Sequence, residues 1–490
     1  MRLHGIKDYL DMVAMLEKYP KIHQTFNLVP SLIEQIEDYA GKRSKDKFLE
    51  LSYRPAAELN SQEKEFIFNN FFKINPEKCI AVHPRYYELY SKKKAKKEFN
   101  TQDYLDLQVW FNLAWFDPDF RKSIPELSRL VLKARFFSEE DKRAVLEKQF
   151  SVLAEVMPNY KKFAASGQIE VTLSPYYHPI LPLLCNINIA KEANHKVVLP
   201  QIQFSYPQDA KAQINQGVEL YEKYFGAKPR GMWPSEESVS QQILPSIIEA
   251  GINWIVADEA ILFKSLKLKK REPALLYQPH LLKREEGDLN IVFRDRNLSD
   301  LLGFVYQRWE PKAAVDDFMK HIKNISGIAK DKDILVTLAM DGENAWEYYS
   351  NDGHDFLEAL YQSISAVDFV KAITVSEYLK DHPAKNEIFH LAAGSWIYAE
   401  FAKWIGSAKK NKAWEYLAKA RQELEESKGK IDGQNLALAW KQIYILEGSD
   451  WFWWYGDDDT GDFDKLYRMH MINFYTIIGK QPPDYLSSSL

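Results

Sequence analysis

Short apolar and β-branched runs alternate with amphipathic stretches along most of the chain. Six such runs stand out, at 22–29, 169–173, 231–233, 252–257, 289–293 and 334–340. An alternation of this kind is typical of parallel β/α units, in which each strand is followed by a helix that returns the chain. The pattern therefore predicts an α/β fold built on a parallel sheet.

Polar side chains collect where these runs end. The residues that lie in or just after the runs are Asn27, Glu170, Glu236, Asp258, Asp295, Asp341 and Glu343. In a β/α barrel the strand C-termini converge on one face, where the loops build the active site. A doubly wound sheet would also place carboxylates there, but no Gly-x-Gly-x-x-Gly sequence follows any run. We therefore expect a barrel.

After about residue 380 the strand-like runs give way to longer helical patterns, such as 411–427. We predict a catalytic barrel over 1–380 and an α-helical C-terminal domain over 381–490, packed beside the barrel mouth. The segment 448–456 is the densest aromatic cluster, and we favour helix packing over a sugar subsite as its role. The acidic run 457–462 lacks EF-hand spacing, so we expect a solvated loop there.

The composition is that of a globular protein with a sizeable core. The chain has 490 residues, of which 46% are hydrophobic and 27% charged. Lys and Arg number 64 against 69 Asp and Glu, a formal charge of −5, which gives no electrostatic reason to bind nucleic acid or an anionic membrane. We interpret the basic run 92–97 as a solvated loop.

Cysteine usage and the N-terminus both favour a cytoplasmic location. Cys79 and Cys185 are too few for a disulfide framework and neither lies in a Cys-x-x-Cys motif. Asp8 and Asp11 interrupt the apolar region that a signal peptide needs. Three prolines make 171–190, the longest stretch without charged residues, a poor membrane helix.

The first candidate motif presents Trp233 and, three residues later, Glu236 after a short strand. An aromatic ring beside a carboxylate suits a sugar subsite, because sugar faces stack on indole and a carboxylate can attack an anomeric carbon. The alternative is a surface glutamate near a core tryptophan.

The second motif places Asp295 at the end of a strand between Arg294 and Arg296. A plain salt bridge is the alternative to a catalytic role for Asp295. Ser299 and Asp300 are well placed to cap the helix that follows.

The third motif puts Asp341, Glu343 and Glu347 around Trp346. No His or Cys lies within it to support a zinc site, so we predict no metal ligands here and favour recognition of sugar hydroxyls, with Trp346 as a stacking surface. A calcium site is the alternative, since calcium prefers oxygen ligands.

The fourth motif, 167–178, could bring Glu170 and His178 to the same mouth. A lone histidine more often forms hydrogen bonds within the protein than to a ligand. A structural role for His178 is therefore the commoner interpretation, and contact with the substrate is the alternative.

These four motifs, in this order, resemble glycoside hydrolase family 57, the retaining α-glucan enzymes that include amylopullulanases, α-amylases and 4-α-glucanotransferases. Segments 27–32, 394–397, 404–406 and 448–456 extend the likeness, which is closest to the amylopullulanase type. The resemblance implies a distorted (β/α)7 TIM-like barrel followed by a helical bundle. It also implies Glu236 of Trp-x-x-Glu as nucleophile and Asp295 of Phe-Arg-Asp as general acid/base. The substrate-binding residues that we predict are Trp233, Glu170, His178, Arg294, Asp341, Glu343 and Trp346.

The resemblance implies cleavage of α-1,4 bonds, extending to α-1,6, in an α-glucan, with no organic cofactor. In a retaining enzyme the two carboxyl groups lie about 5–5.5 Å apart, one attacking while the other protonates the departing oxygen. We expect burial and the charge of Glu236 to raise the pKa of Asp295, opposed by Arg294 or Arg296.

Three other functions compete with hydrolysis. Glucan transfer, by a 4-α-glucanotransferase or a branching-type transferase, uses the same intermediate. Family members begin with a strand that carries a His-Gln-Pro-type motif, and nothing precedes Met1 here, so we expect the first barrel strand to be missing. A catalytically impaired glucan-binding protein is therefore the alternative from another class. A metal-dependent deacetylase-like barrel is less favoured because the motifs offer no convincing His/Asp metal triad.

Overall fold

A computed structural model describes residues 1–329, 332–456 and 461–490 of the chain. Its centre is a mixed sheet with the strand order β1-β2-β3-β4-β6-β5-β7. The strands are β1 (Gln24–Leu28), β2 (Ile169–Leu173), β3 (Gly231–Met232), β4 (Trp254–Asp258), β5 (His280–Arg284), β6 (Gly287–Arg294) and β7 (Asn386–Glu387). The neighbours from β1 to β4, and β4 with β6, pair in parallel, whereas β5 and β6 form an antiparallel hairpin. The first five predicted runs are therefore strands.

The sixth predicted run, 334–340, makes a single parallel bridge, between Thr337 and Arg294. β4 pairs with β6 as far as Arg294, and β5 covers the opposite edge of β6 as far as Ile291. Residues 334–340 can therefore pair only with the last residues on this edge of β6. There the Asp295 N–H donates a hydrogen bond to the Thr337 carbonyl over 2.8 Å. Because β1 pairs with β2 alone, the strand ladder does not close within the described residues.

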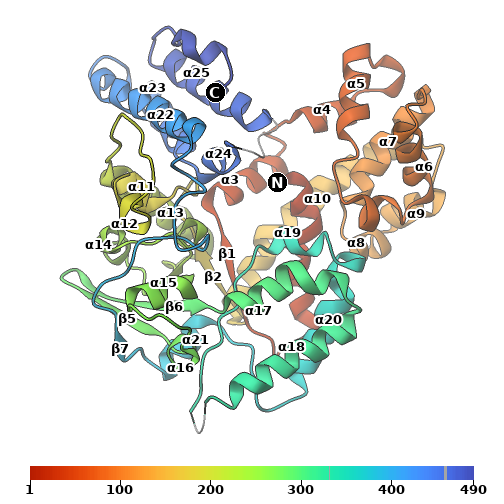
Figure 1. The fold of residues 1–490 in the computed structure, drawn as a ribbon. Helices are drawn as coiled ribbons and strands as arrows, with labels where there is room; N and C mark the ends of the chain where they lie inside the picture. The colour runs from red at the N-terminus through yellow and green to blue at the C-terminus, as the bar shows by residue number, and fades with distance from the viewer. Residues whose placement is uncertain (330–331, 457–460) are drawn as a thin grey trace.

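A long helical insert between β1 and β2 packs on one side of the sheet (Figure 1). Its helices are α3 (Pro30–Ala40), α4 (Lys47–Tyr53), α5 (Ser61–Asn70), α6 (Pro84–Lys94), α7 (Thr101–Ala114), α8 (Pro118–Ser123), α9 (Pro125–Lys133) and α10 (Glu139–Ser166). α10 begins with a capping box of Ser138 and Asp141 and ends at Gly167, whose φ of 79° is the left-handed conformation that glycine adopts without strain. The predicted basic loop is partly wrong, because Lys92, Lys93 and Lys94 form the last turn of α6.

The remaining helices before the C-terminal region connect and cover the strands. They are α1 (Arg2–His4), α2 (Leu10–Ala14), α11 (Leu181–Cys185), α12 (Ile189–Ala193), α13 (Pro207–Phe225), α14 (Leu244–Glu249), α15 (Glu259–Ser265), α16 (Pro273–Leu276), α17 (Arg296–Asp300), α18 (Pro311–Ser326), α19 (Gly342–Trp346), α20 (His354–Ser365) and α21 (Val375–Asp381). Both cysteines are buried and free. No helix among the described residues combines the length and apolar character needed to cross a membrane.

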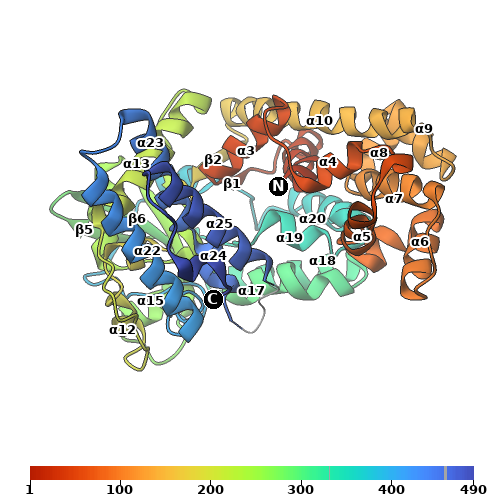
Figure 2. The ribbon, with the colours of Figure 1, turned by 90° about the horizontal axis from the view of Figure 1, so that it is seen from above.

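The C-terminal region is helical, as predicted, and lies at the upper left in Figure 1, whereas most of the insert lies at the right in Figures 1 and 2. It consists of α22 (Ala408–Ser427), α23 (Gly433–Leu446), α24 (Ser449–Trp454) and α25 (Asp462–Ile477). The boundary at 380 stays a prediction, although β7 joins the sheet after it. The predicted acidic loop 457–462 lies mostly outside the described residues.

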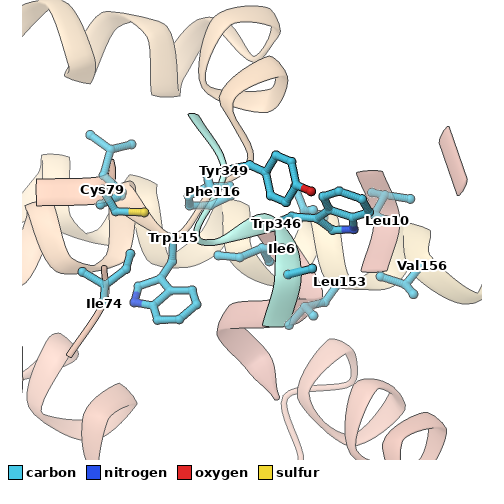
Figure 3. Close-up of a cluster of buried hydrophobic side chains, with 14 of the residues drawn as sticks. Ile6, Leu10, Ile74, Cys79, Trp115, Phe116, Leu153, Val156, Trp346 and Tyr349 are labelled. Carbon is cyan, nitrogen blue, oxygen red and sulfur yellow. The ribbon is translucent and has the colours of Figure 1, made fainter. Parts of the chain in front are cut away.

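Two large apolar clusters hold these parts together. One joins the N-terminal residues to the insert and to α19, and includes Trp346, which is 8% exposed and packs against Tyr349 and Phe356 (Figure 3). The prediction that Trp346 offers a stacking surface is therefore not met: an indole packed in the core has little face left for a sugar. The other cluster joins the sheet to the C-terminal helices.

Candidate active site

Glu236 lies in the tight turn Ser235–Glu237, just beyond the C-terminal end of β3. Glu236 and Glu237 have φ values of 58° and 49°, in the left-handed region that residues other than glycine seldom adopt. Strain of this kind persists only where surrounding contacts over-determine it, and it concentrates at functional sites. Here the turn sends two adjacent carboxylates to different partners.

Glu236 is held by Trp396. The indole Nε1 donates to Glu236 Oε2 over 2.8 Å, and the backbone N–H of Trp396 donates to the Glu236 carbonyl over 3.2 Å. Burial raises the pKa of Glu236 to about 8; the Trp396 hydrogen bond opposes this rise, and the charges of Asp341 and Asp450 add to it. A raised pKa therefore belongs to Glu236, the predicted nucleophile.

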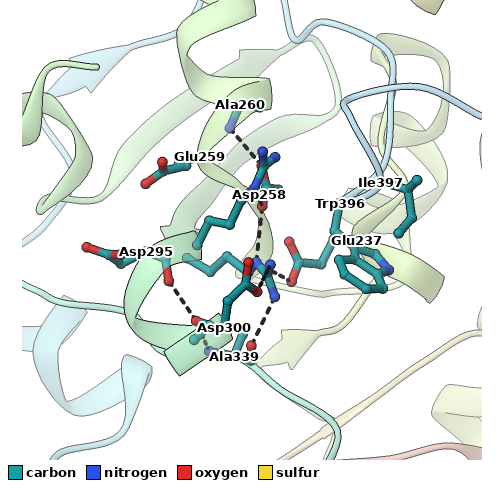
Figure 4. A network of polar contacts seen from close by, with 12 residues as sticks. Glu237, Asp258, Glu259, Ala260, Asp295, Asp300, Ala339, Trp396 and Ile397 are labelled. Atoms are coloured by element: carbon teal, nitrogen blue, oxygen red, sulfur yellow. Dashed lines mark hydrogen bonds and ion pairs between the residues drawn. The ribbon is translucent and has the colours of Figure 1, made fainter. Parts of the chain in front are cut away.

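Glu237 belongs to a buried polar network around Arg294 (Figure 4). Glu237 is 1% exposed, and its Oε1 lies 3.8 Å from Arg294 Nε. Arg294 also donates to Asp258, Asp300 and the Ala339 carbonyl over 3.1–3.2 Å. Burial raises the pKa of Glu237, and the Arg294 charge opposes that rise. Arg294, a predicted substrate contact, is thus committed to protein carboxylates.

The carboxylate of Asp295 accepts three hydrogen bonds. Its Oδ1 accepts from the Leu298 N–H and caps α17, so the cap is Asp295 itself and not Ser299 or Asp300 as the sequence suggested. Its Oδ2 accepts from Arg271 Nη2 over 2.8 Å and from Tyr277 Oη over 2.7 Å.

These groups line a cavity of about 480 Å³ that also contains Glu259 and His321. Asp295 lies across the network from Glu237 and Trp396 in Figure 4. Within the described part of the chain, no hydrogen bond or ion pair joins Asp295 to Glu236. Two carboxyl groups about 5–5.5 Å apart would form neither contact, so the pairing of Glu236 with Asp295 stays a prediction.

The charge of Asp341 acts on several groups of this region. The residue is exposed, directly before α19, and Asn344 Nδ2 donates to it over 3.2 Å. Its negative charge contributes to the raised pKa values of Glu236, Asp450 and Glu343, in each of which burial is the larger cause. The structure thus gathers Glu236, Asp341 and Asp450 in one electrostatic neighbourhood.

His178 belongs to the same neighbourhood. Its Nδ1 lies 2.9 Å from Ser449 Oγ, and its backbone carbonyl accepts from the Ser449 N–H. Burial lowers the pKa of His178 to about 4 against the opposing charge of Asp341, so the ring is neutral near pH 7. A neutral imidazole can accept or donate a hydrogen bond to a sugar hydroxyl.

Glu170 and Trp233 are placed differently from what the sequence suggested. Glu170 is the second residue of β2 and therefore lies near the N-terminal end of that strand, away from the mouth. Its carboxylate accepts from Trp254 Nε1 at 2.9 Å and from the N–H and hydroxyl of Ser376 at 3.0 and 2.5 Å. Trp233 is half-buried against the apolar cluster that contains Trp254 and Val292.

The aromatic segment 448–456 both packs the bundle and reaches the site. Phe452 is fully buried and stacks on Trp414, with ring centroids 4.3 Å apart. Trp453 stacks on Trp396 at 6.3 Å with an interplanar angle of 18°. The predicted packing role is therefore accompanied by support of the indole that binds Glu236.

A family model described as Glycosyl hydrolase family 57 matches residues 1–391. The chain belongs to glycosyl hydrolase family 57. The resemblance inferred from the four motifs is thereby confirmed, and family membership places the chain among enzymes that act on O-glycosyl bonds.

Two curated relatives match about half of the chain. Alpha-amylase 1 of Dictyoglomus thermophilum is 25% identical over 287 residues, 58% of this chain and 35% of the relative. The 4-alpha-glucanotransferase of Thermococcus litoralis is 21% identical over 291 residues, 55% of this chain and 37% of the relative. The aligned part is thus little more than a third of each relative.

Two solved structures match nearly the whole chain. The GH57-type branching enzyme of Pyrococcus horikoshii covers 97% of this chain and 84% of its own, with a TM-score of 0.59 and 17% identity. The α-amylase AmyC of Thermotoga maritima covers 98% and 88%, with a TM-score of 0.61 and 13% identity. These likenesses confirm the predicted fold, a TIM-like barrel followed by a helical domain.

One buried group in this family 57 chain has the residue types of a metal site. Among the described residues, ligand atoms of Asp11, Asp117 and His354 all lie within 4.8 Å of one another. His354 Nε2 is 2.8 Å from Asp117 Oδ2 and 3.5 Å from Asp11 Oδ2. The two carboxylates, with Asp119, outweigh the cost of burial and raise the pKa of His354 to about 9. An imidazolium between carboxylates already accounts for this arrangement without a metal.

Trp396, Asp450 and Tyr277 lie at the site without having been predicted there. Trp396 stands in the segment 394–397 that contributed to the family resemblance, which was the available signal. Asp450 lies within the aromatic segment 448–456, whose composition indicates helix packing and gives no signal for a carboxylate site. Tyr277 precedes β5 in a stretch without a motif.

Proposed function

We propose that this family 57 chain is an α-glucan-active enzyme that cleaves α-1,4 glucosidic bonds with retention, using Glu236 as nucleophile. The observation that carries the proposal is the strained turn after β3, which presents Glu236 to the Trp396 indole within the charge field of Asp341. Its matched relatives carry the names α-amylase and 4-alpha-glucanotransferase, and both kinds of name refer to α-glucans.

We infer Asp341, rather than the predicted Asp295, as the general acid/base. A retaining mechanism needs two carboxyl groups on either side of one glycosidic bond, about 5–5.5 Å apart. Both oxygens of Asp295 are taken by Arg271, Tyr277 and a helix N-terminus. Asp341 is exposed and raises the pKa of Glu236, which supports it as the partner carboxyl. Asp295, favoured by the sequence motif, is the alternative.

Reducing-sugar release from amylose and pullulan tests the reaction, with Glu236→Gln as the matched control. We expect release from amylose by the full chain and its loss in Glu236→Gln. Retention is read from the anomer that forms first, by proton NMR. A chain that binds amylose, releases no sugar and forms no longer oligosaccharides from maltotriose is a glucan-binding protein, and this outcome would reject the enzymatic proposal.

The leaving group distinguishes the two candidate acids. α-Maltosyl fluoride needs no protonation to depart, so a variant that lacks the general acid keeps more activity on this substrate than on amylose. We expect Asp341→Asn to show that contrast and Asp295→Asn to lose activity on both substrates in parallel. The reverse pattern would assign the acid to Asp295.

Glucan transfer is the second candidate. The stacked pair of Trp396 and Trp453 beside Glu236 favours it, because an aromatic surface next to the intermediate can hold an acceptor sugar and limit the access of water. Incubation with maltotriose separates the two reactions: transfer yields longer oligosaccharides, whereas hydrolysis yields only shorter ones.

A further inference from the structure

A cavity of about 620 Å³ lies outside the active-site residues, between α3, α13, α23 and the loop that follows β2. We call it the side pocket and define it by Glu34, Tyr176, Tyr177, Gln216, Trp440 and Tyr444 among its lining residues. Its volume is in the range of pockets that bind small ligands.

Aromatic rings supply much of the lining. Tyr176 and Tyr177 pack with ring centroids 4.7 Å apart, and Trp440 stacks on Tyr444 at 5.3 Å with an interplanar angle of 27°. Tyr176, Tyr177 and Trp440 keep part of their surface exposed. Rigid rings on two walls of a cavity suit a ligand with flat, weakly apolar faces.

The polar part of the lining carries no net charge. Glu34 and Glu219 are matched by Lys223 and Lys441. Glu34 already accepts hydrogen bonds from Tyr177 Oη and Lys441 Nζ, which fixes its orientation. A balanced lining gives no preference for a phosphate or a cation, whereas carboxylate, amide, phenol and ammonium groups together can donate to and accept from many hydroxyls.

Two segments of the chain run from the side pocket to the active-site region. Tyr177 lines the pocket, and the next residue, His178, contacts Ser449 and is acted on by the charge of Asp341. α23 forms the opposite wall and leads into Ser449. A long polymer bound in the pocket would therefore remain close to the mouth.

We propose that the side pocket is a second α-glucan-binding site, separate from the catalytic mouth. Rings for stacking, a charge-balanced lining and hydrogen-bonding groups match a neutral polyhydroxylated chain. The class of sugar rests on the proposed function, whereas the site itself rests on the pocket.

Isothermal titration with maltoheptaose tests the site in the full chain, with Glu236→Gln as background to prevent turnover. We expect two binding events. Ala437→Arg introduces a long side chain from an exposed lining position of α23, and it should weaken one event about tenfold, the loss expected when stacking and hydrogen bonds are blocked. Leu438→Arg is the matched control, because Leu438 is 43% exposed and does not line the pocket.

Tyr176→Ala, which removes one of the lining rings, provides a second test of the pocket if Ala437→Arg fails to fold. The proposal is overturned if the parent shows one event or none, or if the folded pocket variants bind maltoheptaose as Leu438→Arg does. Sugar release by the unmodified chain is measured separately. If Ala437→Arg weakens binding but the unmodified chain releases no sugar, the proposed reaction is rejected and the binding site in the side pocket is retained. If the unmodified chain releases sugar but Ala437→Arg leaves binding unchanged, the reaction is retained and the binding site is rejected.

Discussion

The indole nitrogen of Trp396 donates a 2.8 Å hydrogen bond to the carboxylate of Glu236, across 160 residues of sequence. This contact ties the turn after β3 to the segment that precedes the helical C-terminal region. Trp453 stacks on the same indole, so the C-terminal helices support the side chain that we propose as nucleophile. The two parts of the fold therefore cooperate at one carboxylate.

Replacing Trp396 with Phe should raise the pKa of Glu236. The indole hydrogen bond stabilises the ionised carboxylate and opposes the rise to about 8 that burial causes. Without it, a smaller fraction of Glu236 is ionised at neutral pH, so we expect the acid limb of the kcat/KM profile to move up by about one pH unit. Trp453→Phe keeps the hydrogen bond and is the control. An unmoved limb in Trp396→Phe would show that Glu236 does not set it.

The sequence predicted the strands well because buried parallel strands are nearly continuous apolar runs. It failed for 334–340, where the β5–β6 hairpin covers the strand edge that the run would have used. Edge competition depends on which segments meet in three dimensions, and a local pattern does not contain that information.

The site was predictable to a similar extent. Glu236 could be identified from its spacing to Trp233, but its partner Trp396 comes from a distant segment. Periodicity could not tell that Trp346 packs against Tyr349 in the core, because an exposed and a buried tryptophan look alike in a short motif. Asp295 shows the same limit, since Arg271 and Tyr277 reach it from 24 and 18 residues away.

Trp346→Ala should therefore reduce stability far more than glucan affinity. The side chain is 8% exposed and contacts Tyr349, Phe356 and Gly353, so its removal leaves a cavity. Large-to-small changes of this kind cost about 3–5 kcal/mol. Urea unfolding measures the loss, and maltoheptaose titration of the folded fraction measures binding. Weakened binding at unchanged stability would restore the sugar-stacking role that the sequence suggested.

Removing the guanidinium of Arg294 should destabilise the chain strongly. Glu237 and Asp258 are 1% and 0% exposed, and Arg294 lies against both. Truncation to Met would leave these carboxylates short of a buried cation, a change that costs about 3–5 kcal/mol. A loss below about 1 kcal/mol in Arg294→Met would contradict the network.

His354 should make stability depend on pH above neutrality. Its folded pKa of about 9 lies above the ordinary value of 6.5, because Asp117 and Asp11 stabilise the imidazolium. The folded state therefore binds this proton more tightly than the unfolded chain, so the stabilisation is full below pH 6.5 and is lost as pH rises through 9.

Unfolding free energies between pH 6 and 9.5 check this expectation. We expect the wild-type chain to lose about 2–3 kcal/mol over this interval through His354. His354→Asn should be less stable at pH 6 and show a flatter dependence above it, because the titrating imidazole is gone. His321→Asn is the control, since His321 lies near the Asp295 cavity and has 41% of its side chain exposed. Equal slopes in His354→Asn and the wild type would exclude the buried imidazolium.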